Sequence, residues 1–303
     1  ENLNASNTNS QYVDVFNDAS GIDTTTNTSR NASEYVDTTT NDTNTMLLLQ
    51  SETSNGSTTF TDAVGNSTFT KSGSVRHDTG TAKFGSSSIY FLGNTYITTP
   101  DNDSYFDFGT GDFTLEAWVY LSGTSPAGLI DQSASSATSN SAYILYFDGT
   151  DFGTYFSSQD ANSWDKSAQG STSRSTGQWY HVAGVRNGAN LTTYVNGTST
   201  SQITSMSGVE LHNSSRNISF GIQNADSPSS YLDGYMEEIR ISNIARYTSN
   251  FTAPSSPFAF SSLNATGNFT SNAISTADSS SINKAGAVIT YQDQAGTNAL
   301  NTD

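Results

Sequence analysis

The sequence predicts an all-β chain whose main part is a two-sheet antiparallel jelly-roll sandwich, and three observations carry this prediction. Residues 113–121 and 179–185 alternate apolar and polar side chains with a period of two, which is typical of strands that bury one face. Asn187 and Gly188 supply the positive-φ residues of a tight hairpin, and residues 191–195 return as the partner strand. Turn signals recur roughly every eight to twelve residues along the rest of the chain, as in jelly rolls.

The two signature strands set the faces of the predicted sheet. In residues 113–121, one face carries Phe113, Leu115, Ala117 and Val119, and the other carries Glu116, Trp118 and Tyr120. In the second strand, Trp179, His181, Ala183 and Val185 fall on one side. Further strands are expected at residues 46–49, 69–71, 84–91, 96–99, 128–131, 142–147, 152–156, 218–222 and 232–242. No stretch has the pattern of an amphipathic helix.

Three segments are expected. Residues 1–45 are rich in Asn, Thr and Ser and form an extended N-terminal arm or connector, because such a segment cannot build a core alone. Residues 46–260 form the jelly-roll domain. Residues 261–303 are expected to begin a second β module that is incomplete, or that finishes its fold against another subunit. Because the chain begins at Glu1 without an initiator methionine, a processed form or a piece of a longer protein is expected.

Composition narrows the classes of function. Of the 303 residues, 33% are hydrophobic and 13% charged, so Ser, Thr, Asn and Gly carry most of the polarity. The formal net charge of −17 would repel a phosphate backbone, which argues against nucleic-acid binding. The chain has no cysteine, so disulfides and thiolate metal sites are not available. No run approaches the roughly 18 apolar residues of a membrane span, so no membrane insertion is expected.

A family resemblance follows from five segments. Residues 84–91, 111–118, 178–183, 194–197 and 232–241 resemble the laminin-G-like, concanavalin-A-like lectin/glucanase domains. Residues 245–258 are similar to a variant common in bacteriophage tail-fibre and other virion structural proteins, many of them marine. The resemblance covers about residues 46–260, and it implies the fold more strongly than any ligand.

A glycoside hydrolase would need two carboxylates about 5 Å apart. The glucanase members of the fold carry a Glu-x-Asp-x-x-Glu pattern on one strand, and this sequence lacks it. Glu237 and Glu238 are adjacent, so they are expected on opposite sides of their strand, and Glu116 stands alone. The histidines His77, His181 and His212 lack ligand spacing. We therefore predict that the chain is not an enzyme.

Calcium is the metal that the resemblance implies, because laminin-G-like domains often hold one at a loop rim through carboxylates and carbonyls. Many relatives carry Asp-Gly-x-x-Asp after the position of Phe91, but residues 92–96 here lack both acids. The remaining candidate ligands are Asp62, Asp131 and Asp233. No cofactor is otherwise expected.

Aromatic side chains are the candidate ligand-binding residues, because sugar rings stack on exposed Trp or Tyr beside hydrogen-bonding groups. Tyr143, Tyr146 and Tyr155 lie in strands that would form one face, and Trp164 lies in a polar loop at its rim. Trp118 and Trp179 are expected in the core.

Two functions fit these features. The first is a virion structural protein, as a tail fibre, appendage or capsid-decoration component at the virion surface, with a lectin-like domain for assembly and host-glycan adhesion. Its partners would be copies of itself in a symmetric oligomer, other virion proteins and a host surface glycan. The alternative is a secreted or cell-surface adhesin, or a carbohydrate-binding module, of a marine prokaryote.

Overall fold

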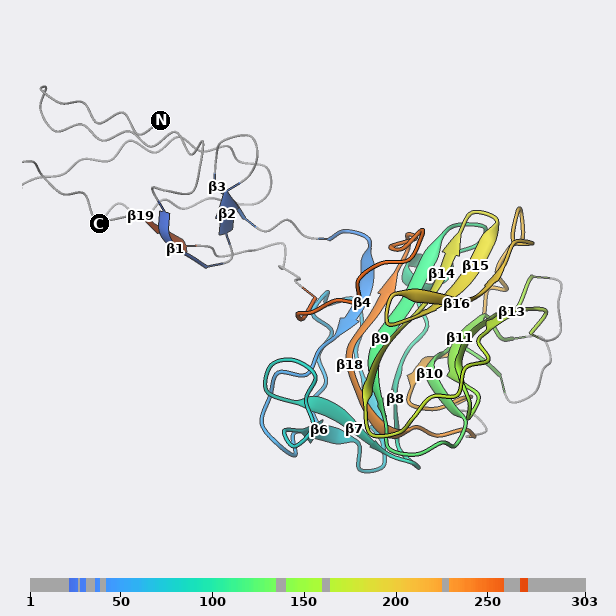
Figure 1. Cartoon of the computed structure of the whole chain (residues 1–303), viewed down its shortest axis with the longest axis horizontal. Helices are drawn as coiled ribbons and strands as arrows, with labels where there is room; N and C mark the ends of the chain where they lie inside the picture. The colour runs from blue at the N-terminus through green and yellow to red at the C-terminus, as the bar shows by residue number, and fades with distance from the viewer. Residues whose placement is uncertain are drawn as a thin grey trace, which may run out of the picture. The chain divides into compact units, whose positions relative to one another are not determined.

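The structure is a computed structural model, and it describes residues 22–26, 28–30, 36–38, 42–134, 140–159, 164–224, 229–258 and 268–271. The contacts divide the chain into two compact units. One unit is Thr43–Ala259, and the other combines Glu1–Asp42 with Phe260–Asp303. Figure 1 shows the larger unit as two facing layers of strands.

The larger unit is an antiparallel β-sandwich, which confirms the predicted fold class. One sheet has seven strands in the order β13 (Lys166–Gln169), β12 (Phe152–Phe156), β11 (Tyr143–Phe147), β10 (Ala127–Asp131), β17 (Ile218–Phe220), β8 (Tyr96–Thr99) and β5 (Thr70–Ser72). The other has eight strands: β16 (Thr198–Ile203), β15 (Asn190–Val195), β14 (Trp179–Asn187), β9 (Phe113–Leu121), β18 (Asp233–Ser242), β7 (Ser88–Leu92) and β6 (Arg76–Asp78) in that order, with β4 (Thr45–Leu49) also paired to β18.

The core lies between the two sheets and follows the period-two pattern of the sequence. Phe113, Leu115 and Val119 of β9 are fully buried in it. The ring of Phe113 stacks against Phe156 of the facing sheet, with centroids 6.2 Å apart. Burying each such side chain stabilises the fold by about 1.5–3 kcal/mol, so the aromatic layer holds the two sheets together.

Two tight turns connect β14, β15 and β16 into consecutive hairpins at one edge of the eight-stranded sheet. The Asn187–Asn190 pair closes the hairpin between β14 and β15, with Gly188 at φ 56°. Asn196 and Gly197 make the next turn, at φ 51° and 79°. That turn leads into β16, which the sequence does not predict because its residues are polar and partly exposed. The described part of the chain has one short helix, α1 (Asp103–Phe106).

Strand β18 contains a β-bulge that interrupts its alternation. Glu237 lies opposite Trp118, but Arg240 rather than Ile239 lies opposite Glu116, so one extra residue is inserted. The bulge contains Glu238, which has a φ of 51°. As a result Glu237 and Arg240 both face away from the core although they are three positions apart.

After β18, residues 243–258 run over the outer face of the eight-stranded sheet, and we call this segment the strap. Its Tyr247 and Phe251 rings stack on each other at a centroid distance of 3.6 Å. They pack with Ala183 and Tyr194 in a second, smaller hydrophobic cluster. The backbone amide of Phe251 donates to the carbonyl of Gly197 at 2.9 Å. The sandwich is therefore covered on part of one outer face.

The smaller unit contains strands that precede the sandwich in the sequence and one strand that follows it. β1 (Ile22–Thr26) is antiparallel to β19 (Asn268–Ser271), and β2 (Thr28–Arg30) is antiparallel to β3 (Val36–Thr38). The other parts of the expected N-terminal arm and C-terminal module, including residues 1–21 and 272–303, lie outside the described residues.

Candidate functional site

Three of the four predicted aromatic residues meet on the outer face of the seven-stranded sheet, and we call them the aromatic patch. Tyr146 on β11 and Tyr155 on β12 pack edge to face, with centroids 6.1 Å apart. Trp164, just before β13, packs edge to face against Tyr155 at 6.4 Å. All three side chains are partly exposed. Their neighbours in the strands, such as Leu145 and Phe156, point into the core, so alternation places the patch outside.

Polar side chains accept hydrogen bonds from both tyrosines of the aromatic patch. The Tyr155 hydroxyl donates to Gln169 Oε1 at 3.1 Å, and the Tyr146 hydroxyl donates to Ser230 Oγ at 3.2 Å. Gln169 is itself fixed, because its Nε2 donates to the carbonyls of Asp151 and Gly170, each at 3.1 Å. Its side chain crosses β12 above Gly153, where any Cβ would collide with the Gln169 amide.

The patch has the chemistry of a carbohydrate-stacking surface. Burial, together with the nearby charge of Asp148, raises the pKa of Tyr155, so its phenol stays protonated and remains a donor. Partly exposed rings offer apolar faces for the C–H groups of a sugar, and the amide and hydroxyls beside them offer hydrogen bonds.

Tyr143 is a correction to the predicted set. Its side chain has no exposed surface and lies in the core between the rings of Phe108 and Phe113, at centroid distances of 5.8 and 6.1 Å. Burial raises its pKa well above the ordinary value. Tyr143 and Tyr146 are separated by an odd number of positions along β11, so in a regular strand their side chains point to opposite faces of the sheet.

Asp62 has no free acceptor position for a calcium ion. Its Oδ1 accepts the amides of Leu48 and Val64 at 2.9 and 3.1 Å. Its Oδ2 accepts the amides of Asn66 and Ser67 at 2.9 and 3.0 Å. The carboxylate therefore ties the turn after residue 62 to β4, which is a structural role.

The other two calcium candidates lie elsewhere in the sandwich. Asp131 is fully buried at the end of β10, where its Oδ2 accepts the amide of Asn224 at 2.8 Å. Asp233 is exposed at the start of β18, next to Gly123. Among the described residues, no group of three or more His, Asp or Glu side chains is arranged to hold a metal ion. The structure does not bring the three predicted ligands together.

Glu116 has no carboxylate among its hydrogen-bond partners in the described part of the chain, and it is the centre of a buried network. Its Oε1 accepts from Arg240 at 2.7 Å, and its Oε2 accepts from His181 Nε2 at 3.1 Å and from the Tyr247 hydroxyl at 2.8 Å. Burial alone raises the pKa of Glu116, but the Arg240 charge and the hydrogen bonds of His181 and Arg240 lower it to about 2. The network fastens the strap to the sheet and leaves no carboxylate oxygen open.

Glu237 and Glu238 also hold segments of backbone. Glu237 accepts the amides of Lys83 and Phe84 at 2.6 and 2.9 Å. Glu238 accepts the amide of Phe258 at 2.6 Å and the side-chain amide of Gln50. Burial raises the pKa of Glu237 to about 7. Because of the bulge, strict alternation does not apply to Glu237 and Glu238. Both carboxylates nevertheless accept hydrogen bonds that hold backbone segments in place.

Trp118 is buried, as expected, but on the outer side of its sheet, whereas Trp179 is partly exposed, contrary to the prediction. Trp118 is 5% exposed but lies on the outer face of β9, under Phe84 and the ammonium group of Lys83, which is 4.0 Å from the ring centroid. Trp179 is partly exposed on the same face of β14. The alternation of β9 already indicates this for Trp118, because it shares a face with Glu116 and lies opposite His181.

Comparison with solved structures supports the fold. The chain is similar to the binding domain of Paraclostridial Mosquitocidal Protein 1, at 16% identity and a TM-score of 0.50, over 67% of this chain and 50% of that one. It is also similar to the receptor binding domain of the botulinum neurotoxin C/D mosaic serotype, at 16% identity and a TM-score of 0.51, over 67% of this chain and 49% of that one. The chain spans about half the length of these structures, and at such identities the likeness concerns the fold alone.

Comparison with curated protein sequences finds no match. In the described part of the chain, no helix is long and apolar enough to cross a membrane. A family model described as the concanavalin A-like lectin/glucanases superfamily matches residues 91–250, which is more than half of the chain. The sandwich, its lectin-like layout and this match agree, and the chain belongs to the concanavalin A-like lectin/glucanase superfamily.

Proposed function

We propose that this chain is a non-catalytic structural protein of a virion, a fibre, appendage or capsid-decoration component, whose lectin-like sandwich is displayed at the virion surface and adheres to a host glycan. The observation that carries the adhesive part is the aromatic patch. Its three partly exposed rings lie side by side on a lectin-like fold, with Gln169 and Ser230 as polar neighbours.

Glycan binding is also in keeping with one structural relative. A botulinum neurotoxin type C structure of 15% identity and TM-score 0.50 is described by its dependence on two ganglioside molecules for cell entry. That statement concerns the toxin, and the shared feature is the fold. The match covers 49% of that chain, so the ganglioside dependence belongs to the toxin as a whole and gives this proposal a direction to test.

The virion role draws its support from the strap. The strap contains the segment, residues 245–258, that is similar to tail-fibre and other virion structural proteins. In this chain the segment has a definite structural use, since Tyr247 and Phe251 pack on the sheet and Phe258 packs under Arg240, 3.5 Å from the guanidinium carbon to the ring centroid. We propose that copies of the chain form a symmetric oligomer and contact other virion proteins.

The adhesive part is tested by glycan-array binding of the full chain and of the variants Tyr155→Ala and Trp164→Ala. Loss of one stacking ring should weaken binding by about 1–2 kcal/mol, which is roughly tenfold. Tyr96→Ala is the matched control, because it removes a partly exposed aromatic ring from β8, four strands away from β12 in the same sheet. Binding that vanishes in the control and persists in Trp164→Ala would place the glycan elsewhere and overturn the assignment to the patch.

The virion role is tested by imaging the native assembly from which the protein is purified. Symmetric copies fixed on a particle would support it. A free monomer that binds glycans would contradict it and favour the second candidate, a secreted or cell-surface adhesin or carbohydrate-binding module of a marine prokaryote. The two tests are independent, because a protein can fail one and pass the other.

A further inference from the structure

The sequence contains three Asn-Gly pairs, and each of them lies at a turn of the sandwich. The pairs are Asn55-Gly56, Asn187-Gly188 and Asn196-Gly197. All three glycines have a positive φ. An asparagine followed by glycine is prone to spontaneous deamidation, because glycine has no Cβ to hinder attack of its backbone nitrogen on the asparagine side chain. The structure gives the three pairs different surroundings.

Deamidation at such a pair needs no reactant other than water. The glycine nitrogen attacks Cγ of the asparagine, a C–N bond forms, and the side-chain nitrogen leaves as ammonia, which gives a cyclic succinimide. Water then opens the ring to aspartate or to isoaspartate, whose backbone contains an extra carbon. The glycine nitrogen loses its proton as it attacks and the ammonia gains one as it leaves, so a carboxylate at that nitrogen can act as the general base.

A carboxylate lies at this nitrogen in the pair Asn187-Gly188. Gly188 begins the short turn between β14 and β15, which the paired residues Asn187 and Asn190 close. The amide of Gly188 donates to Oδ1 of Asp112 at 2.6 Å. Asp112 comes directly before β9, and β9 is the other neighbour of β14 in the sheet, so the pairing of the strands puts the carboxylate beside the turn.

The side chain of Asn187 is free to react. It is partly exposed and makes no hydrogen bond to the described residues. A side chain at Gly188 would meet no atom within 4 Å, so the turn has room for the succinimide ring. Asn187 therefore combines an unattached side-chain amide, an open turn and a carboxylate on the attacking nitrogen.

The pair at Asn55 lacks two of these features. Oδ1 of Asn55 accepts the amide of Thr79 at 3.3 Å, so the side chain is attached. The amide of Gly56 donates to the carbonyl of His77 at 2.8 Å. A peptide carbonyl accepts this hydrogen bond but is far too weak a base to take the proton, so the bond only holds the nitrogen in place.

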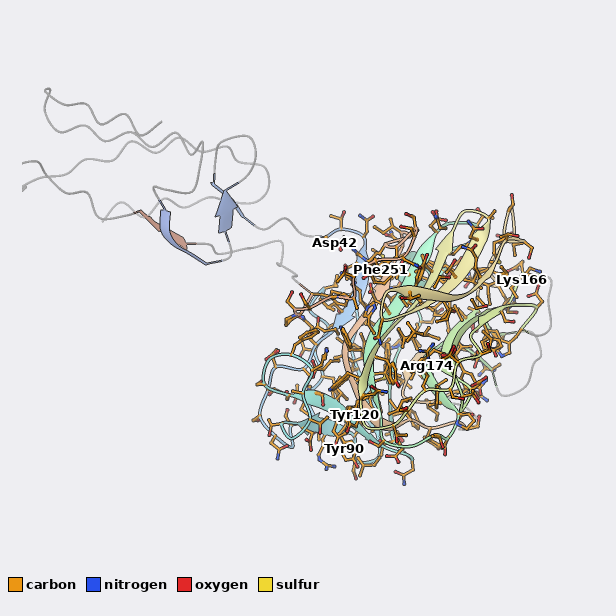
Figure 2. The ribbon with its side chains drawn as sticks, in the orientation of Figure 1. Asp42, Tyr90, Tyr120, Lys166, Arg174 and Phe251 are labelled. Atoms are coloured by element: carbon orange, nitrogen blue, oxygen red, sulfur yellow. The ribbon has the colours of Figure 1, made fainter. Side chains whose placement is uncertain are left out.

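The pair at Asn196 is held more firmly. Oδ1 of Asn196 accepts the amide of His181 at 2.9 Å, and the amide of Asn196 donates to the carbonyl of His181 at 2.8 Å. A Cβ at Gly197 would collide with the carbonyl oxygen of Phe251, so the strap fills the space beside this turn. Figure 2 labels Phe251, the strap residue that makes this contact.

The bond from Gly188 to Asp112 also has a purely structural interpretation, in which it fixes the end of the hairpin and protects Asn187 by holding the nitrogen in place. Protection depends only on the hydrogen bond, whereas base catalysis depends on the basicity of the acceptor. The variant Asp112→Asn separates the two, because an amide oxygen can still accept the bond but cannot take the proton. The unattached side chain of Asn187 favours catalysis, since the other two pairs both have their asparagine side chain bound.

We propose that Asn187 is a site of deamidation in the folded protein and that Asp112 is the base that promotes it. Asp112 takes the proton of the Gly188 nitrogen as the succinimide forms, and returns it to the departing ammonia. Water then opens the ring to aspartate or isoaspartate at position 187. The net change is the gain of one water and the loss of one ammonia. The inference does not rest on the proposed function.

The product alters the hairpin on which the strap packs. Either form puts a second carboxylate beside Asp112, and isoaspartate also lengthens the backbone where β14 enters its turn. Strands β14 and β15, which lie side by side in Figure 1, supply Ala183, Val185 and Tyr194 to the hydrophobic cluster beneath the strap. Ageing of the protein therefore acts on the part of the sheet that the strap covers.

The test follows the three asparagines by peptide mass spectrometry while the full chain is incubated at neutral pH, in buffer and in urea. In urea the three pairs should react at similar rates, because none has its folded surroundings. In the folded chain Asn187 should react at least about tenfold faster than Asn55 and Asn196. Asp112→Asn should slow the reaction at Asn187 about tenfold or more, since a positioned base contributes about 10²–10⁴-fold.

Asp78→Asn is the matched control, because Oδ1 of Asp78 accepts the amide of Gly80 at 2.8 Å in another turn. It should leave the rate at Asn187 unchanged. Asp112 is partly exposed, so Asp112→Asn should fold, and thermal unfolding checks this. If that variant does not fold, the order of the three rates in the unchanged protein still decides whether Asn187 is the site.

Two outcomes would overturn the proposal. One is that Asn187 reacts no faster than Asn55 or Asn196 in the folded chain. The other is that folded Asp112→Asn deamidates at Asn187 as fast as the unchanged protein or faster, which would assign to Asp112 a protective or purely structural role.

Discussion

The buried carboxylate of Glu116 should make the sandwich sensitive to acid, and the variant Glu116→Gln should remove that sensitivity. In the folded protein the carboxylate accepts hydrogen bonds from Arg240, His181 and Tyr247, at 2.7, 3.1 and 2.8 Å. Gln has the same shape but no titratable charge. The two proteins therefore differ in how their free energy of unfolding depends on pH.

The magnitude follows from the pKa. Burial raises the pKa of Glu116, but the charge of Arg240 and the hydrogen bonds from His181 and Arg240 outweigh it and lower the pKa from 4.5 to about 2. Each pKa unit corresponds to about 1.4 kcal/mol, so the carboxylate contributes on the order of 3 kcal/mol to folding. Because the folded pKa is the lower one, this contribution is fully present above about pH 5 and is lost as the pH falls from 4.5 towards 2.

Urea unfolding followed by tryptophan fluorescence measures the effect, since Trp118, Trp164 and Trp179 all lie in the sandwich. The difference in unfolding free energy between the two proteins should be constant from about pH 7 to 5. It should then shrink by on the order of 3 kcal/mol down to about pH 2. Replacement of the exposed Glu210 by Gln is the control and should give a curve parallel to that of the unchanged protein. If Glu116→Gln is also parallel at every pH, the reasoning is refuted.

Three other variants are expected to have distinct effects. Burial raises the pKa of Asp131 from 3.8 to about 7, so its charge increasingly opposes folding as the pH rises through that interval. Asp131→Asn should therefore gain thermal stability relative to the unchanged protein at pH 8 but not at pH 4. An equal gain at both pH values would contradict this. Phe251→Ala removes a ring stacked 3.6 Å from Tyr247 and should cost about 1–3 kcal/mol in urea unfolding, with faster proteolysis of the strap; an unchanged midpoint would count against the strap's packing role. Gly153→Ala places a methyl group where Gln169 lies, so it should weaken glycan binding by the aromatic patch, whereas an unaltered affinity would mean that the position of Gln169 does not matter.

The local pattern of the sequence was sufficient for the sandwich. Strict alternation in residues 113–121 assigns Leu115 and Val119 to the core and Tyr120 to the outside, and the structure agrees. The Asn187–Gly188 turn likewise defines a hairpin from local conformational preference. Such features could be predicted because each depends on residues within a few positions of one another.

Where alternation is absent or interrupted, the sequence was a poor guide. Residues 142–147 are apolar on both faces, so the pattern could not separate the buried Tyr143 from the partly exposed Tyr146. In β18 the inserted residue at the bulge changes which side chains face outwards, and nothing in Glu237 or Glu238 themselves indicates it. The edge strand β16 was missed because its polar residues bury too little surface to leave a pattern.

The sequence by itself determined the fold class, the signature strands and the residue types from which binding surfaces could be built. Only the tertiary structure decided which of those residues meet. For example, Tyr90, Tyr235, Tyr120 and Trp179 come from four strands and lie opposite one another across the eight-stranded sheet. Which residue lies opposite which depends on the register between strands far apart in the chain. That register is set by core packing across the whole sheet and by the bulge, and no local stretch of sequence encodes it.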